Sequence, residues 1–262
     1  MRLVVTTPLR PAPGEERDAL EAAGRCGLPF AARQGRPLTR VMAGAGAEGA
    51  LVLSAAASVL AAGGEEHRWS PGMGLLRVKR LLARRAGAAD PTTHDPFLEA
   101  AGLRPGDAVL DCTAGLAADA LVAAAAVGPR GRVLGLEASP ALAAWTGEGI
   151  RRLELEAARR VEVVGADHLP WLAAAAPRSF DVVLFDPMFR QARGEPGGFD
   201  VVRRLADGRP LSAEALALAR RVARRWELVK DGAPGWDLTR LGLIPLPSAR
   251  GAHRYYARAG AS

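Results

Sequence analysis

The chain has 262 residues, 49% of them hydrophobic, which is enough for one large α/β domain and a small accessory domain and argues against wholesale disorder. Its net charge of +7 favours polyanionic partners, although an arginine excess beside only two lysines also reflects coding bias. No apolar run has the length of a membrane span, no signal peptide is recognisable, and the two cysteines match neither a disulfide framework nor a metal site, so we expect a cytoplasmic protein without membrane or metal.

The first 66 residues are predicted to form a small N-terminal α/β module. Residues 3–6 have the pattern of a strand and residues 15–26 that of a helix, and two short strands bounded by glycines follow at 50–54 and 58–62. This module contains no motif that indicates chemistry.

A basic helix is predicted to lead into the second domain, which spans residues 67–262. Between Leu75 and Arg85, apolar residues recur at helical spacing with cations between them. The helix is either a solvated amphipathic helix or a surface that faces a polyanion. In the second case the contacting cations include Arg77, Lys79 and Arg80.

Strands and helices alternate regularly from residue 95 onward. Strands are predicted at 108–111, 133–137, 161–164, 181–185 and 227–229, and helices at 96–102, 140–158, 213–224 and between the first two strands. This alternation predicts a doubly wound, Rossmann-like and mostly parallel sheet. Residues 243–246 and 254–257 are predicted to add an antiparallel hairpin at its edge.

Acidic residues follow the first two of these strands, at the sheet edge where open α/β folds bind ligands. The first strand ends in Asp111, and the loop after it contains Gly115, where a backbone can approach a ligand closely before the next helix presents its free amides. Glu137 ends the second strand, 22 residues beyond Gly115, the spacing at which an acid meets ribose hydroxyls.

The same edge disfavours a dinucleotide. The loop has one glycine instead of three, and Asp111 and Asp119 would repel a diphosphate. A cationic, ribose-bearing cofactor such as S-adenosylmethionine fits better, with Asp167 after the third strand placed to accept a hydrogen bond from the adenine amino group. Each acid alone could equally cap the next helix, but three acids in succession favour the cofactor site.

The fourth strand ends in Asp186-Pro187-Met188-Phe189. A carboxylate and a backbone carbonyl that accept the hydrogens of an exocyclic amine favour the pyramidal nitrogen that attacks a methyl group. Proline fixes the turn, and an aromatic ring can stack on an unstacked base. The alternative is an Asx-Pro turn with a core phenylalanine. We therefore predict Asp186, Pro187 and Phe189 as catalytic residues.

The segments DCTAGLAADA, GLEAS, VVGADHL and LFDPMF, in this order, resemble class I S-adenosylmethionine-dependent methyltransferases. Among these, the chain is similar to the small-subunit ribosomal RNA guanine-N2 methyltransferase family and its bacillus-type relatives, over residues 67–258. Two positions depart from that family: Ala117-Ala118 stands where the loop usually has glycine and arginine, and Arg190 stands where the nearest members have proline.

The resemblance implies roles for individual residues. Ala118 and Asp119 would contact the methionine part of the cofactor, Glu137 and Ala138 the ribose, and Asp167 and His168 the adenine side. The full predicted cofactor set is Asp111, Gly115, Ala118, Asp119, Glu137, Ala138, Asp167, His168 and Asp186.

The sequence thus predicts an S-adenosylmethionine-dependent N-methyltransferase acting on RNA, at an exocyclic amine of guanine in small-subunit ribosomal RNA. The predicted substrate-binding residues are Phe189, Lys230, Arg77, Lys79 and Arg80, with His253 and Arg254 as further candidates at the same rim. Lys230 could also be an ordinary surface cation. Two other functions stay open: methylation of a small molecule or protein, and RNA binding without catalysis.

Overall fold

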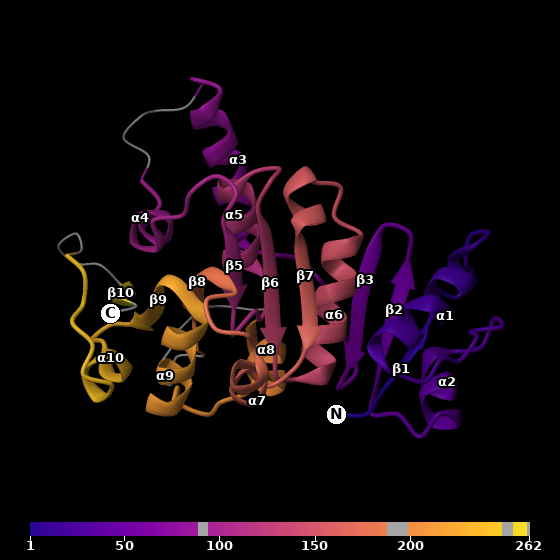
Figure 1. Ribbon diagram of the computed structural model, residues 1–262. Coiled ribbons are helices and arrows are strands. Elements are labelled where there is room, and N and C mark those ends of the chain that lie inside the picture. The colour runs from indigo at the N-terminus through magenta and orange to yellow at the C-terminus, as the bar shows by residue number, and fades with distance from the viewer. Residues whose placement is uncertain (89–93, 188–198, 248–253, 261–262) are drawn as a thin grey trace.

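The computed structural model describes residues 1–88, 94–187, 199–247 and 254–260 (Figure 1). Within these ranges, no helix combines the length and the hydropathy that crossing a membrane requires. The N-terminal part contains β1 (Leu3–Thr6), α1 (Glu15–Cys26), α2 (Leu38–Gly44), β2 (Gly49–Ser54), β3 (Ala57–Ala62) and β4 (Glu65–Arg68).

These strands form a mixed four-stranded sheet in the order β1-β2-β3-β4, in which β1 and β2 are parallel and the other pairs antiparallel. Helix α1 has the predicted bounds, whereas α2 and β4 are not predicted from the sequence. Because β4 ends at Arg68, this sheet extends two residues beyond the predicted boundary at residue 66. The division of the chain into two domains stays a prediction.

The rest of the chain alternates helices and strands around a second sheet. Its elements are α3 (Met73–Arg85), α4 (Pro96–Ala101), β5 (Ala108–Asp111), α5 (Ala118–Val127), β6 (Arg132–Glu137), α6 (Pro140–Arg151), the 3₁₀ helix η1 (Glu156–Arg160), β7 (Val161–Gly165), α7 (His168–Ala174), β8 (Phe180–Phe185), α8 (Phe199–Leu205), α9 (Ala213–Val222), β9 (Ala223–Gly232), α10 (Trp236–Arg240) and β10 (Arg254–Gly260).

This sheet has six strands in the order β10-β9-β8-β5-β6-β7, all parallel except β10. Successive residues of its strands point to opposite faces, so Val109 and Leu184 join one core with α5, α6 and the N-terminal sheet. Leu110 and Val183 join another core with α7 and α9. Both faces are covered, and the predicted doubly wound, Rossmann-like α/β fold is confirmed.

Several predicted boundaries in this part are wrong, among them the end of α6, the end of α9 and the start of β9. Helix α6 ends at Arg151 instead of residue 158, and the guanidinium of Arg152, just after it, donates to the Ser54 carbonyl oxygen (2.7 Å) and pairs with Asp18, both in the N-terminal part. Helix α9 ends two residues earlier than predicted and β9 starts at Ala223, since residues 223–226 pair with the beginning of β8.

The antiparallel edge consists of β9 and β10, which pair along seven residues. The predicted strand at 243–246 does not form. In the described part of the chain, the backbone of this segment is linked to β10 by a hydrogen bond from the Leu246 amide to the Tyr256 carbonyl oxygen (2.7 Å), and the strand that pairs with β10 is β9. An antiparallel pair of strands is therefore present at the edge of the sheet as predicted, but the partner of β10 is β9 and not residues 243–246.

The N-terminal sheet packs against α6 through β3, and Figure 1 shows α6 between β3 and β7. Trp145 donates its indole N–H to the Ser58 carbonyl oxygen (3.2 Å), and the Ser58 hydroxyl donates to the Trp145 carbonyl oxygen (3.0 Å). A Cβ on Gly149 would lie 2.1 Å from the Trp69 ring, so only glycine allows this close approach. These contacts hold in place the helix that follows Glu137.

Candidate functional site

The carboxyl ends of the central strands converge at one edge of the six-stranded sheet, because β5, β6, β8 and β9 run parallel. Two hydrogen bonds donated by backbone amides join the loop after β5 to the carboxyl end of β8 and the residue that follows it. The Asp186 amide donates to Thr113 Oγ1 (2.6 Å), and the Cys112 amide donates to the Leu184 carbonyl oxygen (2.9 Å). The predicted reaction centre therefore lies beside the predicted glycine loop.

A small cavity opens between these loops and α7. Its lining includes six of the residues predicted for the site, namely Gly115, Glu137, Ala138, His168, Asp186 and Pro187. The remaining lining residues are Cys112, Thr113, Ala206, Asp207, Arg209 and Leu211. The structure thus brings together predicted residues that are separated by up to about 70 positions in the sequence.

Glu137 binds the glycine loop to the start of α6. One carboxylate oxygen accepts the Gly115 amide (3.0 Å) and the other accepts the Ser139 amide (2.9 Å). Burial raises the pKa of Glu137 despite these two hydrogen bonds. Gly115 has a φ of +52°, and a Cβ placed there would meet nothing closer than the Thr113 carbonyl oxygen at 3.9 Å. The backbone of the loop is therefore open toward the cavity.

A chain of alternating charges runs behind the cavity. The Lys230 ammonium bridges two carboxylates, at 2.8 Å from Asp119 Oδ2 and 2.5 Å from Asp186 Oδ2. Asp119 also pairs with Arg77 (2.5 Å), whose guanidinium reaches Asp95 at the start of α4 (2.8 Å). Side chains from α3, α4, α5, β8 and β9 thus form one continuous network that ends at Asp186.

The charges in this network depend on each other. Burial alone would lower the pKa of Lys230, but Asp186 and Asp119 outweigh it and the pKa is raised. Burial likewise favours a neutral Asp119, yet Lys230 and Arg77 hold its pKa below the ordinary value. The pKa of Asp186 is raised by the loss of water around it, against the opposing effect of Lys230. Buried Asp111 has its pKa raised to about 7.

Several predicted residues lie elsewhere or have other partners. The structure places Ala118 at the contact between α5 and α3, where a Cβ on Gly74 would come within 2.9 Å of its backbone. Asp167 caps α7 by accepting the Leu169 amide (2.9 Å) and pairs with Arg209 (2.6 Å). The helix-capping alternative considered for this acid is thus present, together with an ion pair that the sequence does not indicate.

The predicted substrate-binding cations, on β9 and on α3, differ in their exposure. The Lys230 side chain is 16% exposed, so the alternative that it is a surface cation is wrong. Arg77 is 21% exposed and bound to two carboxylates, whereas Lys79 and Arg80 are exposed on the same helix. Phe189 and His253 lie outside the described residues.

Sequence reasoning missed Thr113, Asp95 and Arg209 as parts of the site. Asp95-Pro96 has the signature of a helix start, and Asp95 does accept the Leu98 amide (3.1 Å). Its pairing with Arg77 has no such local signal. Thr113 lies within a recognised motif, but its contact with the Asp186 amide depends on the neighbouring strand.

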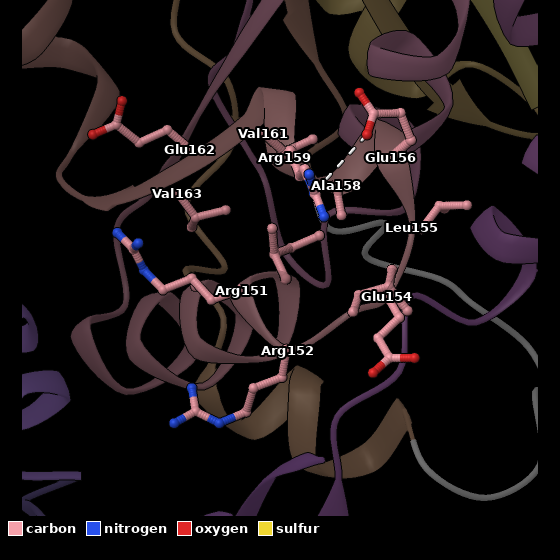
Figure 2. Close-up of a pocket in the computed structure, with 13 residues that line it drawn as sticks. Arg151, Arg152, Glu154, Leu155, Glu156, Ala158, Arg159, Val161, Glu162 and Val163 are labelled. Atoms are coloured by element: carbon pink, nitrogen blue, oxygen red, sulfur yellow. Dashed lines mark ion pairs between the residues drawn. The ribbon is translucent and has the colours of Figure 1, made fainter. Parts of the chain in front are cut away.

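A second hollow, of about 870 Å³, lies beside β7, the outermost strand of the sheet on the side away from β10. It is formed by the end of α6, by η1 and by β7 (Figure 2). Its charged groups are three arginines and three glutamates, and Figure 2 shows Arg159 turned toward Glu156, with which it pairs at 3.9 Å. None of the residues predicted for the cofactor or for catalysis lines it. We therefore assign no part of the reaction to this hollow.

Comparison with known proteins identifies the family. The family model for SAM-dependent methyltransferases matches residues 78–197. Protein YpiP of Bacillus subtilis (strain 168), itself uncharacterised, is 30% identical over 234 residues, which cover 87% of this chain and 88% of that protein. Ribosomal RNA small subunit methyltransferase J of Halorhodospira halophila is 35% identical over 201 residues, which cover 63% of this chain and 73% of that protein.

This chain belongs to the SAM-dependent methyltransferase family. The resemblance seen in the sequence is thus confirmed. A crystal structure of a SAM-dependent methyltransferase from Neisseria gonorrhoeae matches the fold of this methyltransferase with a TM-score of 0.58, covering 97% of this chain and 94% of that one. At 19% identity, that match supports the fold alone.

The residues of the small cavity suit S-adenosylmethionine, the cofactor of this family. Each oxygen of Glu137 accepts one backbone amide and keeps a second lone pair for a ribose hydroxyl, and the open side of Gly115 leaves the loop accessible. The cavity of about 70 Å³ is smaller than the range typical of ligand sites, so lining side chains have to move apart when a nucleoside binds. Arg209, which is 60% exposed, is one lining residue that can move.

Proposed function

We propose that this methyltransferase transfers a methyl group from S-adenosylmethionine to an exocyclic amine of RNA, at a guanine of small-subunit ribosomal RNA. The observation that carries the proposal is Asp186, a carboxylate at the end of β8 that lines the cavity and is held by Lys230 (2.5 Å). The relatives named ribosomal RNA small subunit methyltransferase J support the RNA substrate. Such a role would place the protein in the cytoplasm.

The sulfonium of S-adenosylmethionine supplies an electrophilic methyl group. On the protein side, Lys230 engages Asp186 Oδ2, which leaves Asp186 Oδ1 to accept a hydrogen of the substrate amine. This contact holds the nitrogen lone pair toward the cavity and stabilises the positive charge that develops on nitrogen. The methylated nitrogen then loses a proton, for which Asp186 Oδ1 is the nearest acceptor in this arrangement. Pro187 fixes the turn that presents the carboxylate.

Mass spectrometry of ribosomal RNA nucleosides tests the proposed function. A deletion strain should lack one methylated guanosine in its small-subunit RNA, and the parental gene should restore it while the Asp186→Asn gene should not. An unchanged nucleoside profile contradicts the RNA assignment. In that case, labelled methyl groups in protein or in small molecules would identify the substrate class.

Glu137→Ala is expected to weaken S-adenosylmethionine binding by ~1.5–3 kcal/mol, since it removes charge-assisted hydrogen bonds and releases the Gly115 and Ser139 amides. Isothermal titration calorimetry measures the change. Glu162→Ala, an exposed acid on neighbouring β7, removes the same charge and should bind with parental affinity. Equal affinities for the Glu137 variant and the parent would exclude Glu137 from the ribose role.

Lys79→Ala combined with Arg80→Ala is expected to flatten the salt dependence of binding to single-stranded RNA. Losing two phosphate contacts lowers the slope of log affinity against log salt by about 1.4. Arg77 is left intact because its loss would remove an ion-pair partner from both Asp95 and Asp119. Arg130→Ala with Arg159→Ala removes two other exposed cations and serves as the control. A parental slope in the α3 variant would show that this helix face is only solvated.

A further inference from the structure

A large groove lies on the other side of the ion network from the cofactor cavity. It has a volume of about 930 Å³ and lies between α4, β10 and the residues Leu246 and Pro247. Helix α4 and β10 are joined directly, since the Arg258 guanidinium donates to the Glu99 carbonyl oxygen (2.7 Å) and to the Ala100 carbonyl oxygen. The groove is therefore formed by elements that hold each other in place.

The groove and the cavity meet at one ion pair. Lys230 lines the groove and Asp186 lines the cavity, and their side chains are 2.5 Å apart. Arg254, which also lines the groove, is close enough for its charge to lower the pKa of Asp186. A ligand in the groove would thus lie next to the ion pair that holds the carboxylate, on the side opposite to the cofactor cavity.

The lining has the chemistry of a nucleotide site. Its cations are Arg77, Lys230, Arg254 and Arg258, and its carboxylates are Asp95 and Glu99; of the cations, Arg77 and Lys230 are already paired with carboxylates of the ion network. Pro247 adds exposed apolar surface, whereas Phe97 and Tyr256 are only 3% and 8% exposed and reach the groove by their edges. Tyr256 stands directly opposite Lys230 in the pairing of β9 with β10. Arginine beside aromatic and proline surface suits a phosphate attached to a flat base. The volume lies within the range of small-molecule sites.

We propose that this groove binds one unstacked nucleotide of single-stranded RNA, with its base against Pro247 and the exposed edge of Tyr256 and its phosphate at Arg254. The assignment rests on the proposed function and names the form of RNA that the site accepts. A base inside a duplex is stacked and paired, so its amine cannot pass the groove wall to reach Asp186. A base in a single strand does not first have to be unpaired from a second strand.

Two pairs of matched variants test the groove, with cofactor affinity measured by calorimetry as a check on folding. Pro247→Glu puts a negative charge into the groove, and Ile244→Glu puts the same charge three positions away, on a side chain that is 84% exposed and does not line the groove. Arg254→Ala removes a groove cation, and Arg159→Ala removes one that is 83% exposed at the opposite sheet edge.

The readout is fluorescence anisotropy of a short labelled RNA, single-stranded or in duplex, with the protein saturated with S-adenosylhomocysteine. We expect the parent to prefer the single strand and Pro247→Glu to weaken binding by about tenfold, as for one lost stacked base. Arg254→Ala should lower the salt slope by about 0.7, the value for one phosphate of a single strand. Both controls should bind like the parent.

The possible failures are distinct. A parent that binds neither form of RNA would overturn the proposed function. A parent that binds the single strand, together with groove variants that match their controls, would overturn the groove and leave the function standing. If the parent prefers the duplex, the proposal that the groove binds an unstacked nucleotide is wrong.

Discussion

Asp186→Asn is expected to slow methyl transfer by about a hundred- to a thousandfold at saturating substrate, equivalent to ~2.7–4 kcal/mol of transition-state stabilisation. The substitution keeps the size of the side chain and one acceptor oxygen but removes the negative charge. That charge matters most when positive charge develops on the attacking nitrogen, so the loss belongs in kcat. Cofactor affinity should change little, because Glu137 and the Gly115 loop are untouched.

Single-turnover kinetics together with calorimetry separate these effects. Asp181→Asn is a matched control, since Asp181 lies at the amino end of the same strand, where it accepts the Ala108 amide (2.8 Å) far from the cavity. It should transfer the methyl group at the parental rate. If Asp186→Asn also reacts at that rate, the Asp-Pro segment is only a turn and the amine mechanism is wrong.

Lys230→Met is expected to lower the free energy of unfolding by ~1–3 kcal/mol at pH 8, because it leaves the partly buried Asp186 carboxylate, whose side chain is 32% exposed, without its counter-charge. Asp119 still has Arg77, so the cost falls mainly on Asp186. Without the ammonium, the folded-state pKa of Asp186 rises further above the unfolded value of about 3.9. A raised folded pKa means that stability is present below the unfolded pKa and is lost as pH rises through the folded pKa.

The stability deficit of Lys230→Met should therefore be smaller at pH 5 than at pH 8, as measured by urea unfolding. The double variant Lys230→Met/Asp186→Asn should recover part of the loss at pH 8, since no unpaired charge is left at Asp186. The rate profile of the single variant should also move to higher pH, because Asp186 must be ionised to hold the amine. Equal deficits at both pH values, or strictly additive single variants, would show that Lys230 does not balance Asp186.

The ends of the strands could be predicted from the sequence. Short runs of β-branched and apolar residues, each followed by an acid or glycine, mark β5, β6 and β8 because neighbours in the chain decide whether a segment is extended. Strands that alternate with helices run parallel, so their carboxyl ends lie at one edge of the sheet. This places Asp111, Glu137 and Asp186 together before any distance is known. That reasoning yielded the fold class, the cofactor and half of the residues that line the small cavity.

The partners of the charged residues were decided only by the tertiary structure. Lys230 is 111 positions from Asp119 and 44 from Asp186, and nothing local distinguishes it from a surface cation. Arg77 belongs to a helix with a regular amphipathic pattern, yet packing of α3 on α5 turns it inward while Lys79 and Arg80 stay exposed. Local sequence determines which segments are strands and helices, but the pairing of buried charges depends on how distant segments pack, because each buried charge requires a partner that only the assembled fold supplies.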